Sequence, residues 1–324
     1  MFVKFVSWCV NILLSFYVIR RIPIRSIRLI ITISSCSLLT LVTCQHLNEF
    51  SGLTILIIQA CWLISIRLVD FVGFRIHSKL TLRIYLAKIL WIIFPILKTN
   101  STRSQWSIVF DFLLIIMKIL VNHWIYRWCL NCPSKVNGST TFLVLMSMNT
   151  ITYLMDIPML VVRILTRNKY TIQSFTNFPI LSLSLGEFWG RRSNQLIHFI
   201  FKQSIYQPIR HEFHSATLAR FITFIISGFM HFHIAFLLFN DRSILFSTFF
   251  FFFLHGFVCS IESNVNLQYS EHVRWFLTQI FLLSTTPLLL KPFIIYDWKF
   301  LRFNPPPLFN SSWIPQLTIP TFCP

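Results

Sequence analysis

The sequence predicts an all-α, polytopic integral membrane protein with about eight transmembrane helices (eight or nine) and one interfacial helix. Only 12% of the 324 residues are charged and 55% are apolar, whereas a soluble domain carries about 25% charged residues. Apolar runs of about 18 residues or more recur from end to end of the chain, and such runs are long enough to cross a bilayer as helices. We therefore expect residues 1–324 to form a single integral membrane domain.

Eight apolar runs are predicted to span the membrane. They cover residues 2–19, 29–46, 52–69, 107–126, 141–162, 217–239, 243–261 and 275–295. A ninth segment, 84–98, is short and contains Lys88, so it either crosses the membrane or lies in its interface. We expect it not to cross, because the basic segment 163–216 then falls on the same side as the other basic loops, as the positive-inside rule requires.

The formal net charge of +18 comes mostly from Lys and Arg residues in the short segments between the predicted spans. This distribution indicates topology signals and contact with anionic membrane lipid. No nucleic-acid partner is expected, because the basic residues do not form one soluble block. The asymmetry places both termini in the lumen, together with glycosylation sequons at Asn137 and Asn310. We expect a multi-pass protein of the endoplasmic reticulum.

The longest segment between spans contains an unusual polar stretch, GEFWGRRSNQ, at residues 186–195. It places an acid, two adjacent arginines and an amide beside aromatic residues. From Leu196 to Tyr206 apolar residues then recur at helical spacing, which predicts a helix lying in the membrane interface. On residue types alone, this region is a surface helix whose arginines reach lipid phosphates, or it is a site for a phosphate-bearing substrate.

A second stretch, SGFMHFH at residues 227–233, lies inside the predicted span 217–239. His231 is about 21 Å along this helix, at a depth where an ionisable side chain is costly unless it faces a cavity or a partner. It is therefore either a functional histidine or a packing histidine bonded to a backbone carbonyl. Gly228 allows another helix or a substrate to approach closely. His233 points to a different helix face.

Further polar groups occur in other predicted spans. His255 and Glu262 are seven residues apart and share a helix face, and Glu262 lies near the helix end. Asp156 is expected to pair with a basic neighbour such as Arg163. The ten histidines include no adjacent pair, which argues against a membrane di-iron enzyme, and no metal site is predicted.

Four sequence blocks in order carry a resemblance to a known family. FWGRRSNQ, YQPIR, SGFMHFH and FFFLHGFVCSIE lie within residues 180–265, about a quarter of the chain. Together they resemble the wax synthase-like branch of the membrane-bound O-acyltransferases, the long-chain-alcohol O-fatty-acyltransferases. The resemblance implies an enzyme that transfers an acyl group from acyl-CoA to a fatty alcohol in the membrane and forms a wax ester. Acyl-CoA would be a substrate, and no cofactor is implied.

The resemblance also implies roles for individual residues. His231 matches the catalytic histidine of the family and Asn194 matches its companion polar residue. His231 would take the proton of the alcohol, and Asn194 would orient substrate or donate to the developing oxyanion. Charge and position suggest four groups for the CoA phosphates, with two supporting residues. The phosphate groups are Arg191, Arg192, Lys202 and Arg210, and the supporting residues are Trp189 and Glu262.

The chain departs from the family pattern at two positions. Ser193 stands where the family has a tryptophan, and Phe232 stands where it has an acid. Two alternatives therefore remain: transfer of an acetyl or acyl group to a terpenoid or sterol hydroxyl, and a catalytically silent membrane protein that binds lipid. A His231→Ala variant separates the classes, because only an enzyme would lose turnover. The acyl chain length and the oligomeric state are not predicted.

Overall fold

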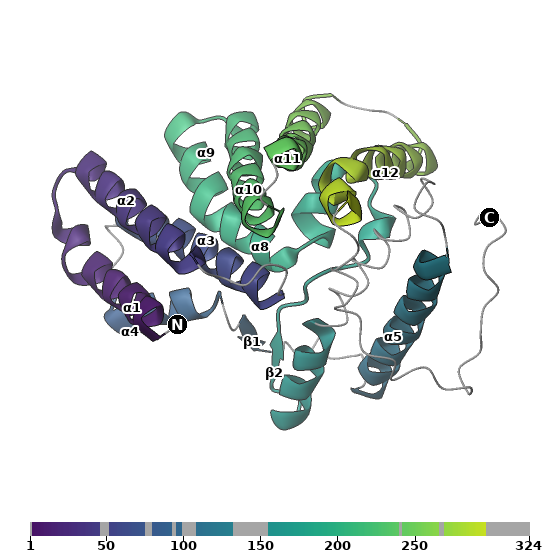
Figure 1. Cartoon of the computed structure of the whole chain (residues 1–324), viewed down its shortest axis with the longest axis horizontal. Helices are drawn as coiled ribbons and strands as arrows, with labels where there is room; N and C mark the ends of the chain where they lie inside the picture. The colour runs from purple at the N-terminus through teal and green to yellow at the C-terminus, as the bar shows by residue number, and fades with distance from the viewer. Residues whose placement is uncertain are drawn as a thin grey trace. The chain divides into compact units, whose positions relative to one another are not determined.

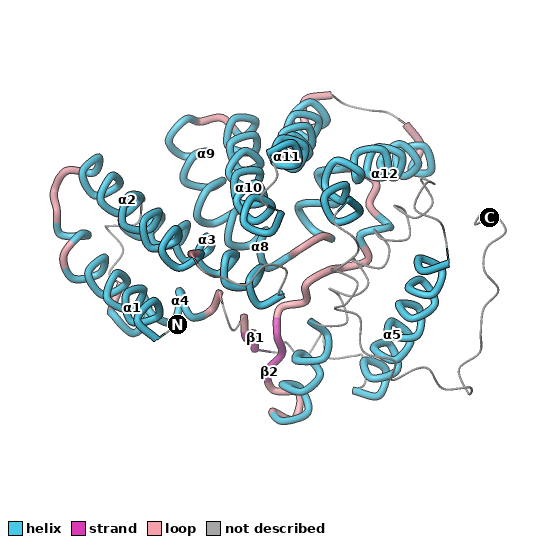
Figure 2. Tube along the Cα trace, in the orientation of Figure 1, coloured by secondary structure: helices cyan, strands magenta, loops and turns pink. Residues whose placement is uncertain are grey.

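The computed structural model describes residues 2–45, 52–74, 80–92, 95–98, 108–131, 155–239, 242–265 and 269–295. These residues are almost entirely helical, which confirms the all-α prediction (Figure 2). The chain forms two compact units, and within the helix α8 (Gln195–Phe201) it passes from one to the other. The first unit comprises Met1–Phe94 and Ile197–Gln268, and the second comprises Pro95–Leu196 and Tyr269–Pro324.

The first unit contains the N-terminal helices and the helices that follow α8 (Figure 1). Its elements are α1 (Phe2–Tyr17), the 3₁₀ turn η1 (Ile19–Arg21), α2 (Arg25–Cys44), α3 (Gly52–Gly73), α4 (Leu82–Leu90), the π-helical turn η4 (Lys202–Tyr206), α9 (Gln207–Phe213), α10 (Ala216–Phe239) and α11 (Arg242–Glu262). A core from α1 to α4 holds the N-terminal helices together. This core is formed by Trp8, Cys36, Cys61, Leu68, Phe71, Tyr85 and Ile89.

Buried Arg28 closes the turn between α1 and α2 and ties it to α3. Its guanidinium donates to the carbonyl oxygens of Ile22 and Pro23 at 2.6 and 3.0 Å, and to that of Val72 at 3.1 Å. These carbonyls lie in a turn and at a helix end, where no intrahelical donor is available. The arginine therefore satisfies backbone acceptors that would otherwise be costly to bury.

Helices α10 and α11 pack closely side by side (Figure 1). Two glycines permit this approach. A Cβ atom at Gly256 would lie 2.5 Å from Cβ of Phe224, and one at Gly228 would lie 3.1 Å from Cδ2 of Phe249. At the end of the pair, Arg220 donates to the carbonyl oxygen of Cys259 at 3.2 Å and so caps the last turn of α11.

The second unit contains two helices joined by ion pairs, a strand pair, a loop with short turns and the last helix. Its elements are β1 (Ile96–Lys98), α5 (Ile108–Asn131), a helix over 155–165, β2 (Tyr170–Ile172), the 3₁₀ turn η2 (Pro179–Leu181), α7 (Leu185–Glu187), the π-helical turn η3 (Phe188–Arg192) and α12 (Glu271–Ile295). The strands pair antiparallel, with Leu97 opposite Thr171. This short sheet was not predicted.

The ion pairs of the second unit correct one expectation. Asp156 pairs with Lys118 of α5, and Arg163 pairs with Asp111 of the same helix. The expected partner of Asp156, Arg163, lies seven residues along the same chain segment but is bound to another carboxylate. Two cross-helix pairs therefore join α5 to the helix over 155–165, and they place each buried charge against an opposite one.

Six described helices are long and apolar enough to cross a membrane. They are Val3–Arg21, Arg25–Cys44, Thr54–Gly73, Ile108–Ile125, Ala216–Phe239 and Glu271–Leu290. Each overlaps one of the eight predicted spans. The predicted span 243–261 corresponds to α11. Residues 141–154 of another span lie outside the described residues, while its remainder is helical.

The segment 84–98 forms a short helix and a strand. Helix α4 has nine residues, so it is about 14 Å long, less than half of the roughly 30 Å hydrocarbon core. β1 follows it after a gap in the described residues. The segment therefore does not cross as one helix, in agreement with the reading chosen from the charge distribution.

Candidate active site

His231 lies on α10, and its imidazole ring is held by a hydrogen bond at Nδ1 and by a stacked aromatic ring. Its Nδ1 is 2.8 Å from the carbonyl oxygen of Ser227, one turn earlier in the helix. A carbonyl oxygen can only accept, so Nδ1 carries the proton and donates. In the neutral ring Nε2 then holds the lone pair. The ring also stacks on Phe252 of α11, with 4.1 Å between centroids and 26° between planes. A bond to a backbone carbonyl is the contact that the packing alternative predicts, and it also leaves on Nε2 the lone pair that a base requires.

His233 has the opposite tautomer. Its Nδ1 is 3.0 Å from Nε1 of Trp62 on α3. The indole N–H can only donate, so Nδ1 accepts and the proton of the neutral ring is on Nε2. His233 therefore faces α3 and presents a donor, whereas His231 stacks against α11. The structure confirms that the two histidines use different helix faces, and only His231 has the tautomer of a base at Nε2.

The other polar candidates lie in the middle and in the last turn of α11. His255 is fully buried, with its ring centroid 4.1 Å from that of Phe251 on the same helix. Glu262 is half-buried in the last turn of α11, as expected for a residue near the helix end. Phe232, which stands at the position of the family acid, is half-buried on α10.

Asn194 lies in the second unit and has a left-handed backbone, with φ of 35°. Asparagine tolerates this conformation better than most residues. The chain around it is held by an adjacent segment. The N–H of Gln195 donates to the carbonyl oxygen of Phe175 at 2.8 Å, and the N–H of Asn177 donates to that of Arg192 at 2.8 Å. The backbone on both sides of Asn194 is thus fixed by hydrogen bonds.

Arg192 is committed to an internal ion pair. Its Nε lies 2.7 Å from Oε1 of Glu187, whose Oε2 accepts from the N–H of Leu183 at 2.9 Å. Burial alone would raise the pKa of Glu187, but these two hydrogen bonds and the charges of Arg192 and Arg191 hold that pKa below its ordinary value. Arg191, by contrast, is exposed. The two adjacent arginines therefore have different surroundings.

Two π-helical turns flank α8. The first, η3, contains Trp189, Arg191 and Arg192, and the second, η4, begins at Lys202. Such turns are rare and occur frequently at functional sites. Trp189 is half-buried with its ring edge-on to Phe188 at 5.0 Å. The sequence predicted a helix over 196–206 but neither of the π-helical turns, because their residue types are those of α-helices.

The remaining predicted cations belong to the first unit. Lys202 and Arg210 are both exposed. His198 of α8 is close enough to Lys202 to be affected by its charge, since burial and then the lysine charge lower the pKa of this histidine. Both cations are thus on the surface, where a phosphate could reach them.

Arg67 of α3 is a buried residue that the sequence analysis did not single out. It is 3% exposed and donates to Oε1 of Gln203 and Oγ of Ser204, at 3.0 Å each. Asp70 lies one turn later, with 3.9 Å between the charged atoms. An arginine and an aspartate three residues apart in an apolar helix, such as Arg67 and Asp70, indicate a polar interaction within the membrane.

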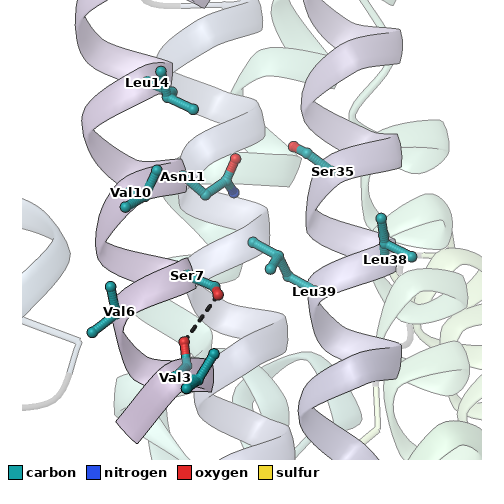
Figure 3. A pocket seen from close by; sticks show the side chains of 9 residues that line it. All are labelled: Val3, Val6, Ser7, Val10, Asn11, Leu14, Ser35, Leu38 and Leu39. Carbon is teal, nitrogen blue, oxygen red and sulfur yellow. Dashed lines mark hydrogen bonds between the residues drawn. The ribbon is translucent and has the colours of Figure 1, made fainter.

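A groove between α1 and α2 lies apart from these residues (Figure 3). Its volume is about 460 Å³. It is lined by Val3, Val6, Ser7, Val10, Asn11, Leu14, Ser35, Leu38 and Leu39. No predicted site residue lines it, so the groove provides no argument about the chemistry.

The predicted site residues are divided between the two units. His231, Lys202, Arg210 and Glu262 belong to the first unit, whereas Trp189, Arg191, Arg192 and Asn194 belong to the second. The pairing of Asn194 with His231 stays a prediction.

Comparisons with known proteins concern the same region. The model of the membrane bound O-acyl transferase family matches residues 172–254. Three curated relatives from Arabidopsis thaliana are similar over about 105 residues: acyl-CoA–sterol O-acyltransferase 1, at 33% identity, and the probable long-chain-alcohol O-fatty-acyltransferases 8 and 6, at 31% and 33%. The matches cover 31–32% of this chain and 30–31% of each relative. The chain thus spans about 30% of the length of the relatives it matches.

Proposed function

We propose that this protein transfers an acyl group from acyl-CoA to the hydroxyl of a lipid alcohol within the membrane. The proposal rests on the segment 172–254, which matches the model of the membrane bound O-acyl transferase family. The single observation that carries the chemistry is the hydrogen bond from Nδ1 of His231 to Ser227. It supports the proposal because it places the proton of the neutral ring on Nδ1 and leaves the lone pair on Nε2, as a general base requires.

The proposed reaction has two stages. Nε2 of His231 takes the proton of the alcohol as the alcohol oxygen attacks the thioester carbonyl carbon. The carbon–sulfur bond then breaks, and the leaving thiolate takes the proton from Nε2, so that ester and CoA are formed and His231 returns to its neutral state. During the reaction the Ser227 carbonyl oxygen stabilises the imidazolium through Nδ1. The stacked ring of Phe252 restrains the imidazole.

The other residues are proposed to bind and orient the substrates. The side-chain amide of Asn194 would donate to the developing oxyanion, and its fixed backbone supports such a preorganised role. The exposed cations Arg191, Lys202 and Arg210 would bind the phosphates of CoA. Arg192 contributes through its pair with Glu187, which stabilises the turn that carries Arg191.

The proposed acceptor is a long-chain fatty alcohol, which would make the product a wax ester, and the proposed location is the endoplasmic reticulum. Two of the relatives are named for long-chain alcohols. A sterol hydroxyl is the second candidate acceptor, because the sterol acyltransferase is equally similar in sequence at 33% identity. The two acceptors require the same base and the same donor.

An acceptor panel tests this function. Purified protein in lipid nanodiscs would receive labelled palmitoyl-CoA with fatty alcohols, sterols or terpenoid alcohols, and the lipid products would be resolved by chromatography. A labelled ester with a fatty alcohol is the expected result. An ester with a sterol or terpenoid alone would change the acceptor and keep the reaction. If folded protein forms no ester with any acceptor, from either palmitoyl-CoA or acetyl-CoA, the enzymatic proposal is wrong and the silent lipid-binding alternative replaces it.

A further inference from the structure

Helix α3 makes two side-chain connections, one partly buried and one buried at Arg67, to elements that carry candidate site residues. Nε1 of Trp62 donates to Nδ1 of His233 on α10, at 3.0 Å. Nη1 of Arg67 donates to Gln203 and Ser204 of η4, at 3.0 Å each. The three elements α3, α10 and η4 also pack against one another. All of them belong to the first unit.

The two connections act at different heights on α3. Trp62 and Arg67 are five residues apart, which corresponds to about 7.5 Å along the helix axis and about 140° around it. One helix therefore reaches two neighbours in two directions. The neighbours are the helix of the proposed base, His231, and the turn that begins with the proposed phosphate ligand, Lys202.

We infer that Trp62 and Arg67 are positioning residues that fix the proposed base and the proposed phosphate ligand relative to each other. This inference rests on the proposed function. Neither residue lies in the segment that matches the family, 172–254, so the comparisons assign no role to them. Each acts through another residue and touches no reacting atom.

The bond from Trp62 controls the rotation of α10. His233 and His231 are two residues apart, so a rotation that releases His233 from α3 also moves His231. A side chain about 6 Å from the helix axis moves by about 1 Å for each 10° of rotation. A misplacement of about 1 Å can lower a catalytic rate by about 100-fold. Loss of the indole donor should therefore lower kcat and leave the binding of acyl-CoA largely intact.

The bonds from Arg67 control the shape of η4. The planar guanidinium reaches two acceptors on successive residues, and its plane lies over Phe199 of α8 with 5.7 Å to the ring centroid. A lysine at this position would keep the charge but could not keep the fork or the stacking geometry. The turn that presents Lys202 would then loosen, and the KM for acyl-CoA should rise while kcat changes little.

The chain offers a matched control for each variant. Nε1 of Trp8 on α1 donates to Oγ1 of Thr43 at 3.0 Å, the same length as the bond of Trp62. Trp8→Phe therefore removes an indole bond between α1 and α2 and leaves the bond from Trp62 to α10 in place. Arg28 is 7% exposed and donates to three backbone carbonyls, so Arg28→Lys disturbs a buried arginine without contact to η4.

The experiment compares Trp62→Phe with Trp8→Phe, and Arg67→Lys with Arg28→Lys. For each protein, kcat and KM for acyl-CoA would be measured per molecule of folded protein, counted by size-exclusion chromatography. Equilibrium binding of a non-reactive acyl-CoA thioether would be measured in parallel. We expect Trp62→Phe to lower kcat about 10- to 100-fold at nearly unchanged KM. We expect Arg67→Lys to weaken thioether binding about tenfold, the effect of losing one hydrogen bond to a charged group.

Other outcomes separate this inference from the proposed function. Each variant could instead lower the folded fraction as much as its control does, without a selective change in kcat for Trp62→Phe or in KM for Arg67→Lys. That result would show that the two residues are merely structural and would overturn the inference. If the parent forms no ester, the proposed function fails, and the thioether measurement still decides for Arg67. Equal binding by Arg67→Lys and Arg28→Lys would then refute the positioning role. If Trp62→Phe misfolds, His233→Phe removes the same bond from the other side and should show the same loss of kcat.

Discussion

Substitution of Gly256 by alanine should destabilise the protein, whereas the same substitution at Gly228 should leave its stability nearly unchanged. An added Cβ at Gly256 would lie 2.5 Å from Cβ and 3.0 Å from Cγ of Phe224, whereas carbon atoms in contact prefer about 3.5–4.0 Å. Since Cβ of Phe224 is fixed to its backbone, α10 and α11 must separate by about 1 Å. Overpacking of this kind costs about 1–3 kcal/mol, and the better helix propensity of alanine returns about 1 kcal/mol. We expect Gly256→Ala to be destabilised by about 1 kcal/mol.

Gly228 provides the matched comparison. An added Cβ there would lie 3.1 Å from a ring atom of Phe249 and 3.4 Å from Cβ of Phe252, so the neighbours need to move by only a few tenths of an ångström. The gain in helix propensity of about 1 kcal/mol should then match or exceed the packing cost. The shift of Phe252 would still disturb the ring stacked on His231. We therefore expect Gly228→Ala to unfold near the parent temperature and to lose turnover.

Thermal unfolding in detergent tests this pair, at one scan rate because membrane proteins often unfold irreversibly. A loss of about 1 kcal/mol corresponds to a decrease of about 2–4 °C for a unit of 150–250 residues. Gly256→Ala should show this decrease and Gly228→Ala should not. The close packing of α10 on α11 would be refuted if Gly256→Ala unfolded at or above the parent temperature, or if the order of the two variants were reversed.

Three further predictions concern the loop that carries Asn194. Asn194→Gly keeps the left-handed backbone and removes the amide, so the folded variant should lose about 100-fold in kcat. Full turnover by the folded variant would show that only the backbone matters. Because the pKa of Glu187 is lowered in the folded protein, its carboxylate stabilises the fold at pH values above the ordinary pKa of 4.5. This stabilisation is lost as the pH falls through the lower pKa of the folded state. The unfolding temperature of the parent should therefore decrease more steeply below about pH 4.5 than that of Glu187→Gln, and parallel curves would contradict the ion pair. Arg192→Gln should lower the unfolding temperature, because it breaks the pair with Glu187. Arg191→Gln should raise the KM for acyl-CoA and leave the unfolding temperature unchanged. The same behaviour in both variants would refute their different roles.

Much of the fold follows from local pattern. Apolar length placed the spans because a helix that crosses a bilayer must be about 20 residues long. The separation of His231 from His233 followed from helical periodicity alone, since two residues turn the helix by about 200°. The short length of α4 agreed with the charge distribution.

The missed features depend on partners far along the chain or on unmarked backbone geometry. Asp156 pairs with Lys118, 38 residues away, so the nearest basic residue in sequence was the wrong choice. Arg67 bonds to residues about 136 positions later, and no local pattern predicts such a contact. The π-helical turns have the same residue types as α-helices. The tautomers of the two histidines needed the identity of their partners, Ser227 and Trp62.

The most direct test of the account is the rate of labelled ester formation by the purified parent and by His231→Gln. Glutamine retains a polar side chain of similar reach but provides no basic nitrogen. If Nε2 of His231 is the base, the variant should fold, bind the acyl-CoA thioether like the parent and form ester about 100- to 10,000-fold more slowly. Ester formation at the parent rate by the folded variant would contradict the account, because the proton of the alcohol would then be removed by another group.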